Sequence, residues 1–149
     1  MKKWLKYFTA IMNVVKTNSP DIHTQVGAVI TTQDNSIVST GYNGLPRKVA
    51  HLAERLQRPD KYNWMEHAER NAIYNAARNG VPLKGTVLYV SAPPCIGCTK
   101  AIIQSGIAVI KMNEVEWDAW WKKDGYELDD WNYYQAKMLN EANVKVMVL

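Results

Sequence analysis

Cysteine is scarce in this sequence, because the 149 residues contain only two, Cys95 and Cys98. Small secreted domains that rely on a disulfide framework use more cysteines, so a framework of that kind is excluded. Two cysteines separated by two residues suit a metal site or a redox pair.

Long apolar runs are also missing. No stretch approaches the roughly 20 residues that a membrane-spanning helix needs. The N-terminus carries three lysines among its first six residues, which makes it too polar for a signal peptide. We therefore expect a cytoplasmic protein with no membrane partner.

The sequence has no long block of lysine and arginine, and its net charge is a modest +4. A basic surface can attract nucleic acid, but it can equally serve a small phosphorylated substrate. Without a basic block, we do not expect a nucleic-acid polymer as partner.

The pattern of apolar residues predicts one domain over residues 1–149, with no repeat and no linker. Strands are predicted at 25–32 and 37–42, joined as a hairpin, and at 86–90, 107–112 and 144–148. Helices are predicted at 4–17, 67–79, 95–105 and 129–142. Strands alternating with helices favour a mostly parallel sheet covered on both faces, to which the hairpin adds one antiparallel strand. The expected fold is α/β, a three-layer α/β/α sandwich with a five-stranded mixed sheet.

A polar stretch over residues 44–64 interrupts this pattern and contains Pro46 and Pro59. Loops of this length without regular structure are commonly functional. We expect a long functional loop, with a short helical piece around residues 50–57.

Two short motifs carry the chemistry: His67-Ala68-Glu69 and Pro94–Cys98. Each follows an irregular or proline-bearing segment and begins a predicted helix, where free N–H groups favour thiolates. One histidine and two thiolates (His67, Cys95 and Cys98) provide three ligands and leave the fourth tetrahedral position of Zn²⁺ for water, as in catalytic zinc sites. Residues two apart on a regular helix point about 200° away from each other. His67 must therefore lie at the very start of its helix if Glu69 is to face the same metal.

The two motifs together are the signature of zinc-dependent nucleobase deaminases, in which an activated water attacks C4 of cytosine or C6 of adenine. Glu69 is the expected catalytic residue, because it can take the water proton, protonate the ring nitrogen and later give a proton to departing ammonia. The alternative is a redox pair of cysteines, which would leave His67 and Glu69 without a function.

The sequence resembles the deoxycytidylate (dCMP) deaminase family from about Ser19 to Ile110. The matching segments are Ser19–Asp21, Thr24–Ala28, Gly41–Pro46, His67–Ile73, Pro94–Cys98 and Ile102–Ile107. The zinc motifs are shared by all cytidine-deaminase-like enzymes, whereas the Gly-Tyr-Asn-Gly element and the long loop before the histidine point to dCMP. The resemblance implies a cytidine-deaminase-like fold and the hydrolysis of dCMP to dUMP and ammonia, a reaction that feeds thymidylate synthesis.

The side chain of Asn43 can both donate and accept, which suits a sugar hydroxyl, and Gly41 and Gly44 would let the backbone approach a ligand closely. An ordinary Asn-Gly turn is the alternative. Ser19 could bind a phosphate or simply form a turn. The resemblance implies an aromatic residue that helps to enclose the base, for which Trp117 is the candidate, although the spacing of Trp117 and Trp121 is equally compatible with core or interface packing. The candidate substrate contacts are Asn43, Ser19, Ala68 and Trp117.

Five cations of the loop outnumber its two acids, and they are Arg47, Lys48, Arg55, Arg58 and Lys61. A nucleotide phosphate needs a local cation of this kind. A solvated charged face is the alternative.

Members of the family are typically homohexamers that dCTP with Mg²⁺ activates and dTTP inhibits, and the resemblance implies the same here. The candidate residues of the regulatory nucleotide site are Tyr42, Asn43, Gly44, Arg47, Lys48 and Arg78. Some relatives hold a second zinc through extra cysteines that this sequence lacks, so one zinc per subunit is expected.

Three rivals remain. A tRNA adenosine deaminase shares both zinc motifs, although the Gly-Tyr-Asn-Gly element and the long loop argue against it. A cytidine deaminase acting on the free nucleoside would have no need of the loop cations. A catalytically silent nucleotide-binding zinc protein would tend to lose Glu69, since that carboxylate is not a metal ligand.

Overall fold

Five strands form one mixed sheet in the computed structural model, which describes residues 2–123 and 125–149. They are β1 (Gly27–Thr31), β2 (Ile37–Tyr42), β3 (Val87–Val90), β4 (Val109–Met112) and β5 (Lys145–Val148). The strand order is β2-β1-β3-β4-β5. Strand β1 is antiparallel to both β2 and β3, while β3, β4 and β5 run parallel. The predicted mixed sheet with one antiparallel strand is confirmed.

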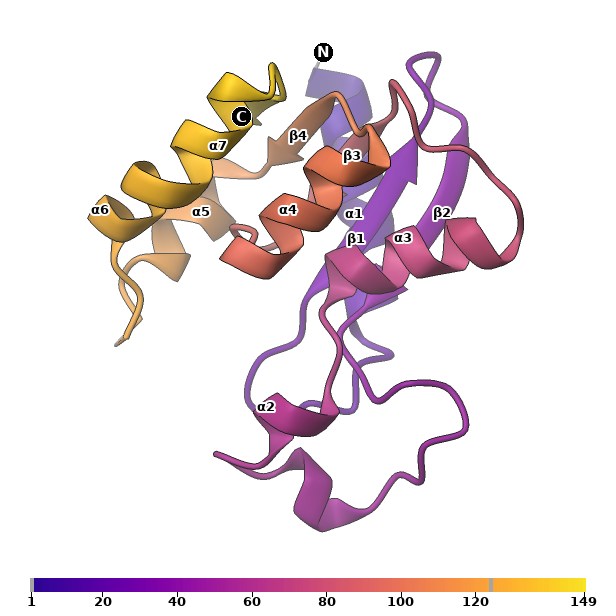
Figure 1. Cartoon of the computed structure of the whole chain (residues 1–149), viewed down its shortest axis with the longest axis vertical. Coiled ribbons are helices and arrows are strands. Elements are labelled where there is room, and N and C mark those ends of the chain that lie inside the picture. Colours follow the sequence, from indigo (N-terminus) through magenta and orange to yellow (C-terminus); the bar gives the residue numbers. More distant parts are fainter. Residues whose placement is uncertain (1, 124) are drawn as a thin grey trace.

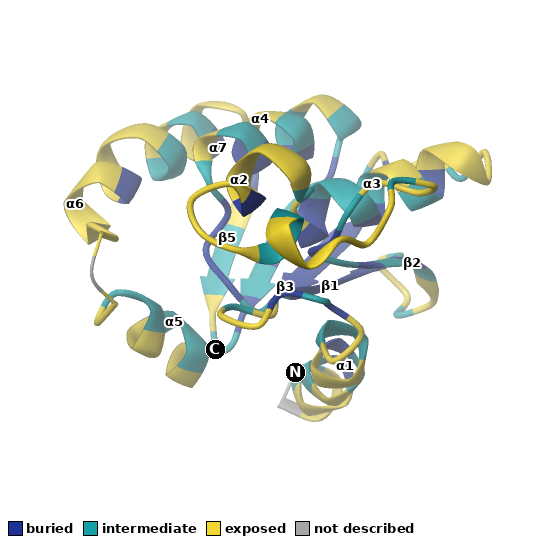
Figure 2. Ribbon diagram, turned by 90° about the horizontal axis from the view of Figure 1, so that it is seen from below, coloured by how far each residue is buried: buried dark blue, intermediate teal, exposed yellow. Residues whose placement is uncertain are grey.

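Helices cover both faces of this sheet, as Figures 1 and 2 show. Helix α1 (Lys2–Lys16) lies on one face, and α3 (Ala68–Arg78) and α4 (Ile96–Ser105) lie on the other. The three-layer sandwich is therefore confirmed. Within the described residues, no helix is both long enough and apolar enough to cross a bilayer.

The C-terminal part is more finely divided than the sequence predicts. The helix expected at 129–142 consists of α6 (Leu128–Trp131), a π-helical turn (Asn132–Ala136) and α7 (Lys137–Glu141), which continue into one another. Helix α5 (Glu114–Trp120) was not predicted, and it lies beside the end of α1, where Lys16 Nζ is 3.1 Å from Glu116 Oε1.

Alternate residues of the central strands point into two separate parts of the core. Ala28 and Ile30 of β1 pack in the cluster on the α3 and α4 side, whereas Val29 packs against Phe8 and Met12 of α1. All residues of β1 and β3 are buried, as expected for strands covered on both faces.

Helix α3 is fixed closely against the edge strand β2. A Cβ atom on Gly41 would lie 2.4 Å from the carbonyl oxygen of Ala68, so only glycine allows this approach. Three side chains add hydrogen bonds between the two elements: Ser39 to Ala72, Asn71 to Tyr42 and Asn75 to Thr40. The expectation that Gly41 admits a ligand is wrong, because the backbone that comes close to it is that of α3.

The stretch between β2 and α3 leaves the sandwich and returns to it, as Figure 1 shows. Its ends are joined by an isolated antiparallel bridge, in which Gly44 N is 3.0 Å from Glu66 O and Glu66 N is 2.8 Å from Gly44 O. The helical piece predicted at 50–57 is a 3₁₀ turn (Ala53–Leu56), and the short helix α2 (Lys61–Trp64) was not predicted. We call residues 44–66 the long loop.

Candidate active site

The two zinc motifs meet where α3 and α4 begin. His67 is the N-cap of α3, with φ −80° and ψ 153°, and Glu69 lies in the first turn. Cys95 is the N-cap of α4, and its Sγ accepts a hydrogen bond from the N–H of Cys98 at 3.4 Å. The backbone of His67 is extended, so the angle of about 200° between residues two apart on a helix does not apply to it. Its side chain can therefore point to the same place as that of Glu69. The expected position of His67 at the helix start is confirmed.

The arrangement of these side chains fits Zn²⁺. Nδ1 of His67 is 3.4 Å from Sγ of Cys95 and 3.5 Å from Sγ of Cys98, and the three ligand atoms all lie within 4.8 Å of one another. Tetrahedral zinc, with Zn–S near 2.3 Å and Zn–N near 2.0–2.1 Å, needs sulfur and nitrogen atoms roughly 3.6 Å apart. The donor set of one imidazole and two thiols is thus spaced for this metal.

Burial and charge shape the protonation of the same groups. Burial raises the pKa of Glu69 to about 7, and only 4% of the residue is exposed. A hydrogen bond from Cys98 and a second from His67 lower the pKa of Cys95 to about 3, while the pKa of Cys98 is raised by the same pairing and by burial. Arg70 lies over the start of α4, because a Cβ on Gly97 would be 2.7 Å from its Nη1. The site therefore combines the buried carboxyl group of Glu69 with a thiol, that of Cys95, which ionises easily and can bind a metal as a thiolate.

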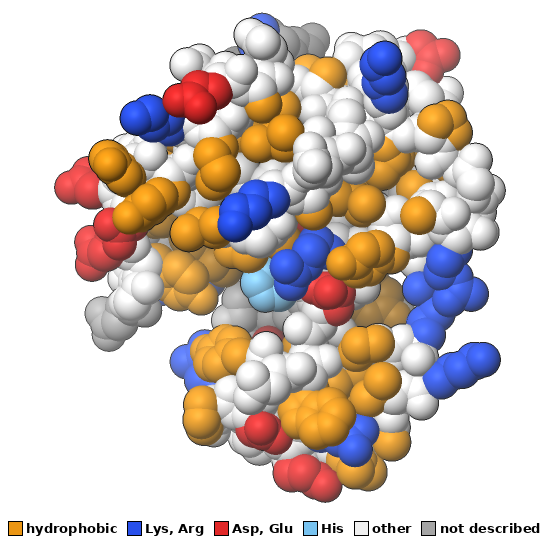
Figure 3. Space-filling view, viewed as in Figure 1, with side chains coloured by type: hydrophobic (Ala, Val, Ile, Leu, Met, Phe, Trp, Pro, Cys, Tyr) orange, Lys and Arg blue, Asp and Glu red, His pale blue; other side chains and the backbone are white. Residues whose placement is uncertain are grey.

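These groups form the floor of a cleft of about 310 Å³, and Figure 3 shows the surface hollowed between the sandwich and the long loop. The residues that we call the floor are His67, Ala68, Glu69, Pro94 and Cys95. Those that we call the rim are Arg58, Lys61, Tyr62 and Met65 of the long loop, with Trp120, Trp121, Tyr126 and Trp131 opposite. A reactive floor thus lies beneath a largely aromatic rim.

A buried ion pair fastens the long loop to the sandwich. Nζ of Lys61 is 2.6 Å from Oδ2 of Asp21, and both residues are buried. Burial alone would raise the pKa of Asp21, but the hydrogen bonds from Lys61 and from the N–H groups of His23 and Thr24 outweigh it, and the pKa is lowered. The two partners are 40 positions apart, so the sequence gives no signal of their pairing.

Asn43 lines the cleft, but its amide is already bound within the protein. Nδ2 donates to the carbonyl of Thr24 at 2.8 Å and to Asp21 at 3.4 Å, and Oδ1 accepts from the N–H of Val26 at 2.8 Å. Both amide hydrogens are therefore used, and a ligand can reach only the second lone pair of Oδ1.

Of the other three predicted substrate contacts, only one lines the cleft. Ala68 lines the cleft, whereas Ser19 and Trp117 are not among the residues that line it. Oγ of Ser19 accepts from the N–H of Asp21 at 3.2 Å in a local turn. Trp117 packs edge-to-face against Trp131 and Trp121, with ring centroids 5.1 and 5.2 Å apart.

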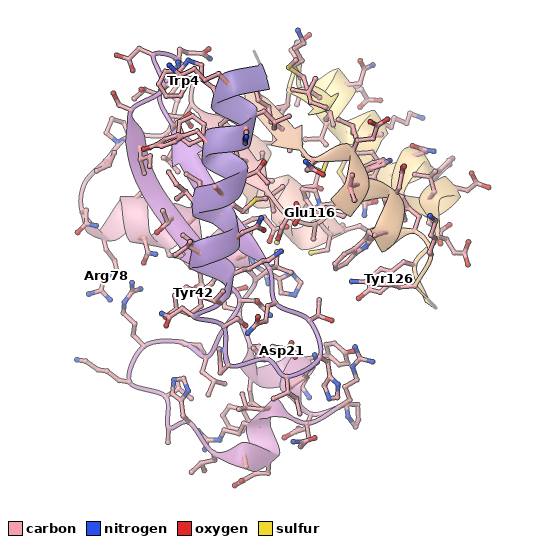
Figure 4. All side chains as sticks on the ribbon, turned by 180° about the vertical axis from the view of Figure 1, so that it is seen from behind. Trp4, Asp21, Tyr42, Arg78, Glu116 and Tyr126 are labelled. Atoms are coloured by element: carbon pink, nitrogen blue, oxygen red, sulfur yellow. The ribbon has the colours of Figure 1, made fainter. Side chains whose placement is uncertain are left out.

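The predicted regulatory residues other than Asn43 do not line the cleft. Tyr42 and Gly44 lie at the base of the long loop, Lys48 is exposed, and Arg47 is hydrogen-bonded to Asn75. Arg78 ends α3, which by its length places it roughly 16 Å along the helix from His67. Figure 4 shows Arg78 and Tyr126 on opposite sides of the molecule.

The sequence did not identify the aromatic part of the rim. Trp131 is buried and its Nε1 donates to the carbonyl of Pro94 at 3.0 Å, next to Cys95. Trp120 and Tyr126 pack with centroids 4.8 Å apart. The only signal was the crowding of tryptophan after residue 113, which does not distinguish the cleft from the core.

Comparison with known proteins agrees with this geometry. Residues 1–114 match the family described as the cytidine and deoxycytidylate deaminase zinc-binding region. An uncharacterised deaminase of Aliivibrio fischeri is 43% identical over 110 residues, which cover 74% of this chain and 72% of that protein. Human deoxycytidylate deaminase is 39% identical over 111 residues, which cover 70% of this chain and 61% of the human protein.

Among solved structures, the dCMP deaminase of cyanophage S-TIM5 has the same fold in its apo form, with a TM-score of 0.75 and 21% identity, over 100% of this chain and 99% of that one. The same enzyme has also been solved with dCMP and dUMP. The family match and the His/Cys/Cys cluster together support Zn²⁺ as the cofactor. This chain therefore belongs to the family of zinc-binding cytidine and deoxycytidylate deaminases.

Proposed function

We propose that this protein hydrolyses dCMP to dUMP and ammonia. The observation that carries the proposal is the buried carboxyl group of Glu69 beside the His67, Cys95 and Cys98 cluster on the floor of a cleft. The names of its relatives support dCMP as substrate, since human deoxycytidylate deaminase is 39% identical to this chain over 111 residues.

His67, Cys95 and Cys98 would hold the metal, with one zinc per subunit. When bound there, Zn²⁺ supplies Lewis-acid activation of a water molecule at neutral pH. Glu69 takes a proton from that water at its carboxylate and delivers it to N3 of the cytosine ring. The oxygen of the water forms the new bond to C4. Glu69 then takes the remaining proton from the hydroxyl group now on C4 and gives it to the 4-amino nitrogen. The C4–N bond breaks, ammonia leaves, and the ring retains the oxygen as the 4-carbonyl of dUMP.

The remaining residues of the cleft bind and shield the base. A volume of about 310 Å³ is at the lower end of the range for small-molecule sites. Trp120, Trp121 and Trp131 supply aromatic surface against which a pyrimidine can stack. By covering the base, they keep bulk water away from Glu69.

Turnover of dCMP, deoxycytidine and dCTP by the zinc-loaded protein tests the proposal, with release of ammonia as the measurement. Wild type should act on dCMP, and Glu69→Gln should bind zinc normally but lose about 10²- to 10⁴-fold in turnover. Glu54→Gln, an exposed change in the long loop, is the matched control. If the zinc-loaded protein released ammonia from an adenosine-bearing tRNA hairpin and from none of these compounds, the proposal would be wrong.

We also propose, from the family resemblance, that dCTP with Mg²⁺ activates a homohexamer, that dTTP inhibits it, and that Tyr42, Asn43, Gly44, Arg47, Lys48 and Arg78 take part. Most of these residues lie at or near the base of the long loop, which supports this proposal. The long loop carries four of the eight rim residues, so a nucleotide bound at its base could shift the rim and change the binding of substrate. Sedimentation and rate curves in dCMP with each triphosphate test it. A hyperbolic curve that neither triphosphate changes would contradict regulation.

A further inference from the structure

The structure shows which of the five cations of the long loop are free to bind a phosphate, which the sequence alone cannot tell. Lys61 is neutralised by Asp21 inside the protein. The guanidinium of Arg55 lies 4.0 Å from the ring centroid of Trp64 and donates to the carbonyl of Ala50. These two cations are therefore occupied in holding the loop together.

Two more cations lie outside the cleft. Arg47 donates to the side chain of Asn75 on α3, and Lys48 is exposed with a left-handed backbone, φ 68°. Neither is among the residues that line the cleft. As the loop stands, neither of them borders the space above Glu69.

Arg58 differs from the other four, because it lines the cleft and is exposed there. Among residues 2–123 and 125–149, its guanidinium has no ion pair and no hydrogen bond. The neighbouring rim residues Tyr62 and Tyr126 offer hydroxyl groups, which can donate to an anion.

A second cation lies near Arg58. Lys123 packs over the ring of Trp120, 4.2 Å from its centroid, and Trp120 lines the cleft. Burial lowers the pKa of Lys123, and the positive charge of Arg58 lowers it further. The two cations thus repel each other, and an anion between them would relieve that repulsion.

The acidic residues of the cleft are distributed differently. Apart from Glu69, the carboxylates that line the cleft are Asp21, which is paired with Lys61, Glu66, which is paired with Arg70, and Glu127 and Asp130. The last two lie in the segment after β4, which also carries Lys123, and have no ion pair in the described part of the chain. These carboxylates repel a phosphate. A phosphorylated ligand is therefore directed to the part of the rim where Arg58 lies.

We propose that Arg58 binds the 5′-phosphate of the substrate and is the residue by which the cleft selects a nucleoside 5′-monophosphate over the free nucleoside. The inference rests on the proposed deamination and names the origin of its specificity. A guanidinium can bind two phosphate oxygens at once, with charge-assisted hydrogen bonds, and it stays charged throughout the working pH range.

The test compares dCMP with deoxycytidine in wild type, Arg58→Gln and Arg58→Lys. For Arg58→Gln we expect kcat/KM to fall about 10- to 100-fold with dCMP and to stay unchanged with deoxycytidine. Arg58→Lys should recover part of the loss, because it restores the charge without the second hydrogen bond. Arg55→Gln is the matched control, since it removes a cation of the same loop that faces Trp64, and it should keep the preference for dCMP.

An equal loss with both substrates in Arg58→Gln, or no loss with either, would overturn the inference while leaving the deamination intact. If wild type turned over neither compound, the proposed function would fail. Calorimetry with dUMP and deoxyuridine then tests the phosphate site separately. Weaker binding of dUMP, but not of deoxyuridine, to Arg58→Gln would still support it, and identical binding of dUMP to both proteins would refute it.

Discussion

On the floor of the cleft, the candidate zinc ligands and Glu69 lie within one turn of a helix N-terminus, whereas the rim is assembled from two distant segments, the long loop and the stretch after β4. The floor is positioned by contacts between neighbouring elements, such as Gly41 against Ala68. The rim depends on individual long-range contacts, of which Lys61 with Asp21 and Trp131 with Pro94 are examples. Floor and rim should therefore respond differently to substitution.

The largest effect is expected from Cys98→Ser, in the zinc cluster beside the floor. Cys98 is buried, and a serine hydroxyl is a poor replacement for a thiolate on zinc. We expect zinc to be lost and turnover of every substrate to fall to background. Metal analysis of the purified protein, with ammonia release, checks this. Full zinc content in the variant would show that the cluster is not the metal site.

On the rim, Lys61→Met should cost about 3–5 kcal/mol in free energy of unfolding, because it leaves the carboxylate of Asp21 buried without its partner. The double variant Asp21→Asn with Lys61→Met should recover part of that loss, since it removes both charges. Unfolding by denaturant of wild type, Lys61→Met and the double variant measures these differences in free energy. A double variant less stable than Lys61→Met would contradict this account.

The same pair predicts a pH dependence. The pKa of Asp21 is lowered in the folded protein, whereas it is about 3.9 in an unfolded chain. The stability that the ionised form contributes is thus complete above that value and is lost as the pH falls through the folded pKa. The difference in free energy of unfolding between wild type and Asp21→Asn should shrink below about pH 4, and a difference that grew instead would exclude this carboxylate as the source.

Gly41→Ala probes the floor without touching a ligand. Its Cβ would lie 2.4 Å from backbone atoms of Ala68 and Ala72, so α3 has to move away from β2, at a cost of about 1–3 kcal/mol. Because His67 and Glu69 move with α3, we expect kcat to fall with dCMP and deoxycytidine alike. Gly44→Ala, whose Cβ would be no closer than 3.4 Å to any neighbour, is the control for the loss of stability.

The smallest effect is expected on the rim, from Trp131→Phe. It removes the hydrogen bond from Nε1 to the carbonyl of Pro94 and should cost about 1 kcal/mol. We expect KM for dCMP to rise more than kcat falls, because in the proposed function the aromatic residues of the rim contact the base and not the reacting atoms. Steady-state kinetics checks this, and a change in kcat alone would assign Trp131 to the floor.

The contrast between floor and rim also explains what the sequence could predict. His67, Glu69, Cys95 and Cys98 occur in two short motifs, so their proximity followed once both were placed at helix starts. Helix α5 was missed although Asn113 caps it, with Oδ1 accepting from the N–H groups of Val115 and Glu116. Two turns are too few to establish a helical period among so many tryptophans.

The remaining failures have a common physical cause. Pairing of Lys61 with Asp21, and the position of Trp117 behind Trp131 instead of in the cleft, depend on how distant segments pack. Local composition carries no information about such contacts. Asn43 was recognised as important, but its amide proved to be bound to Thr24, Val26 and Asp21.

The bridge between Gly44 and Glu66 has a consequence for how this protein can diversify. Since the long loop leaves and re-enters the sandwich at adjacent positions, residues can be inserted between these anchors with only a small added entropy of closure. The hydrolytic centre would keep its shape while the entrance changed. Evolution, or an engineer, can thus lengthen or vary this segment, provided that Lys61 stays paired with Asp21, and give one reaction a new choice of substrate.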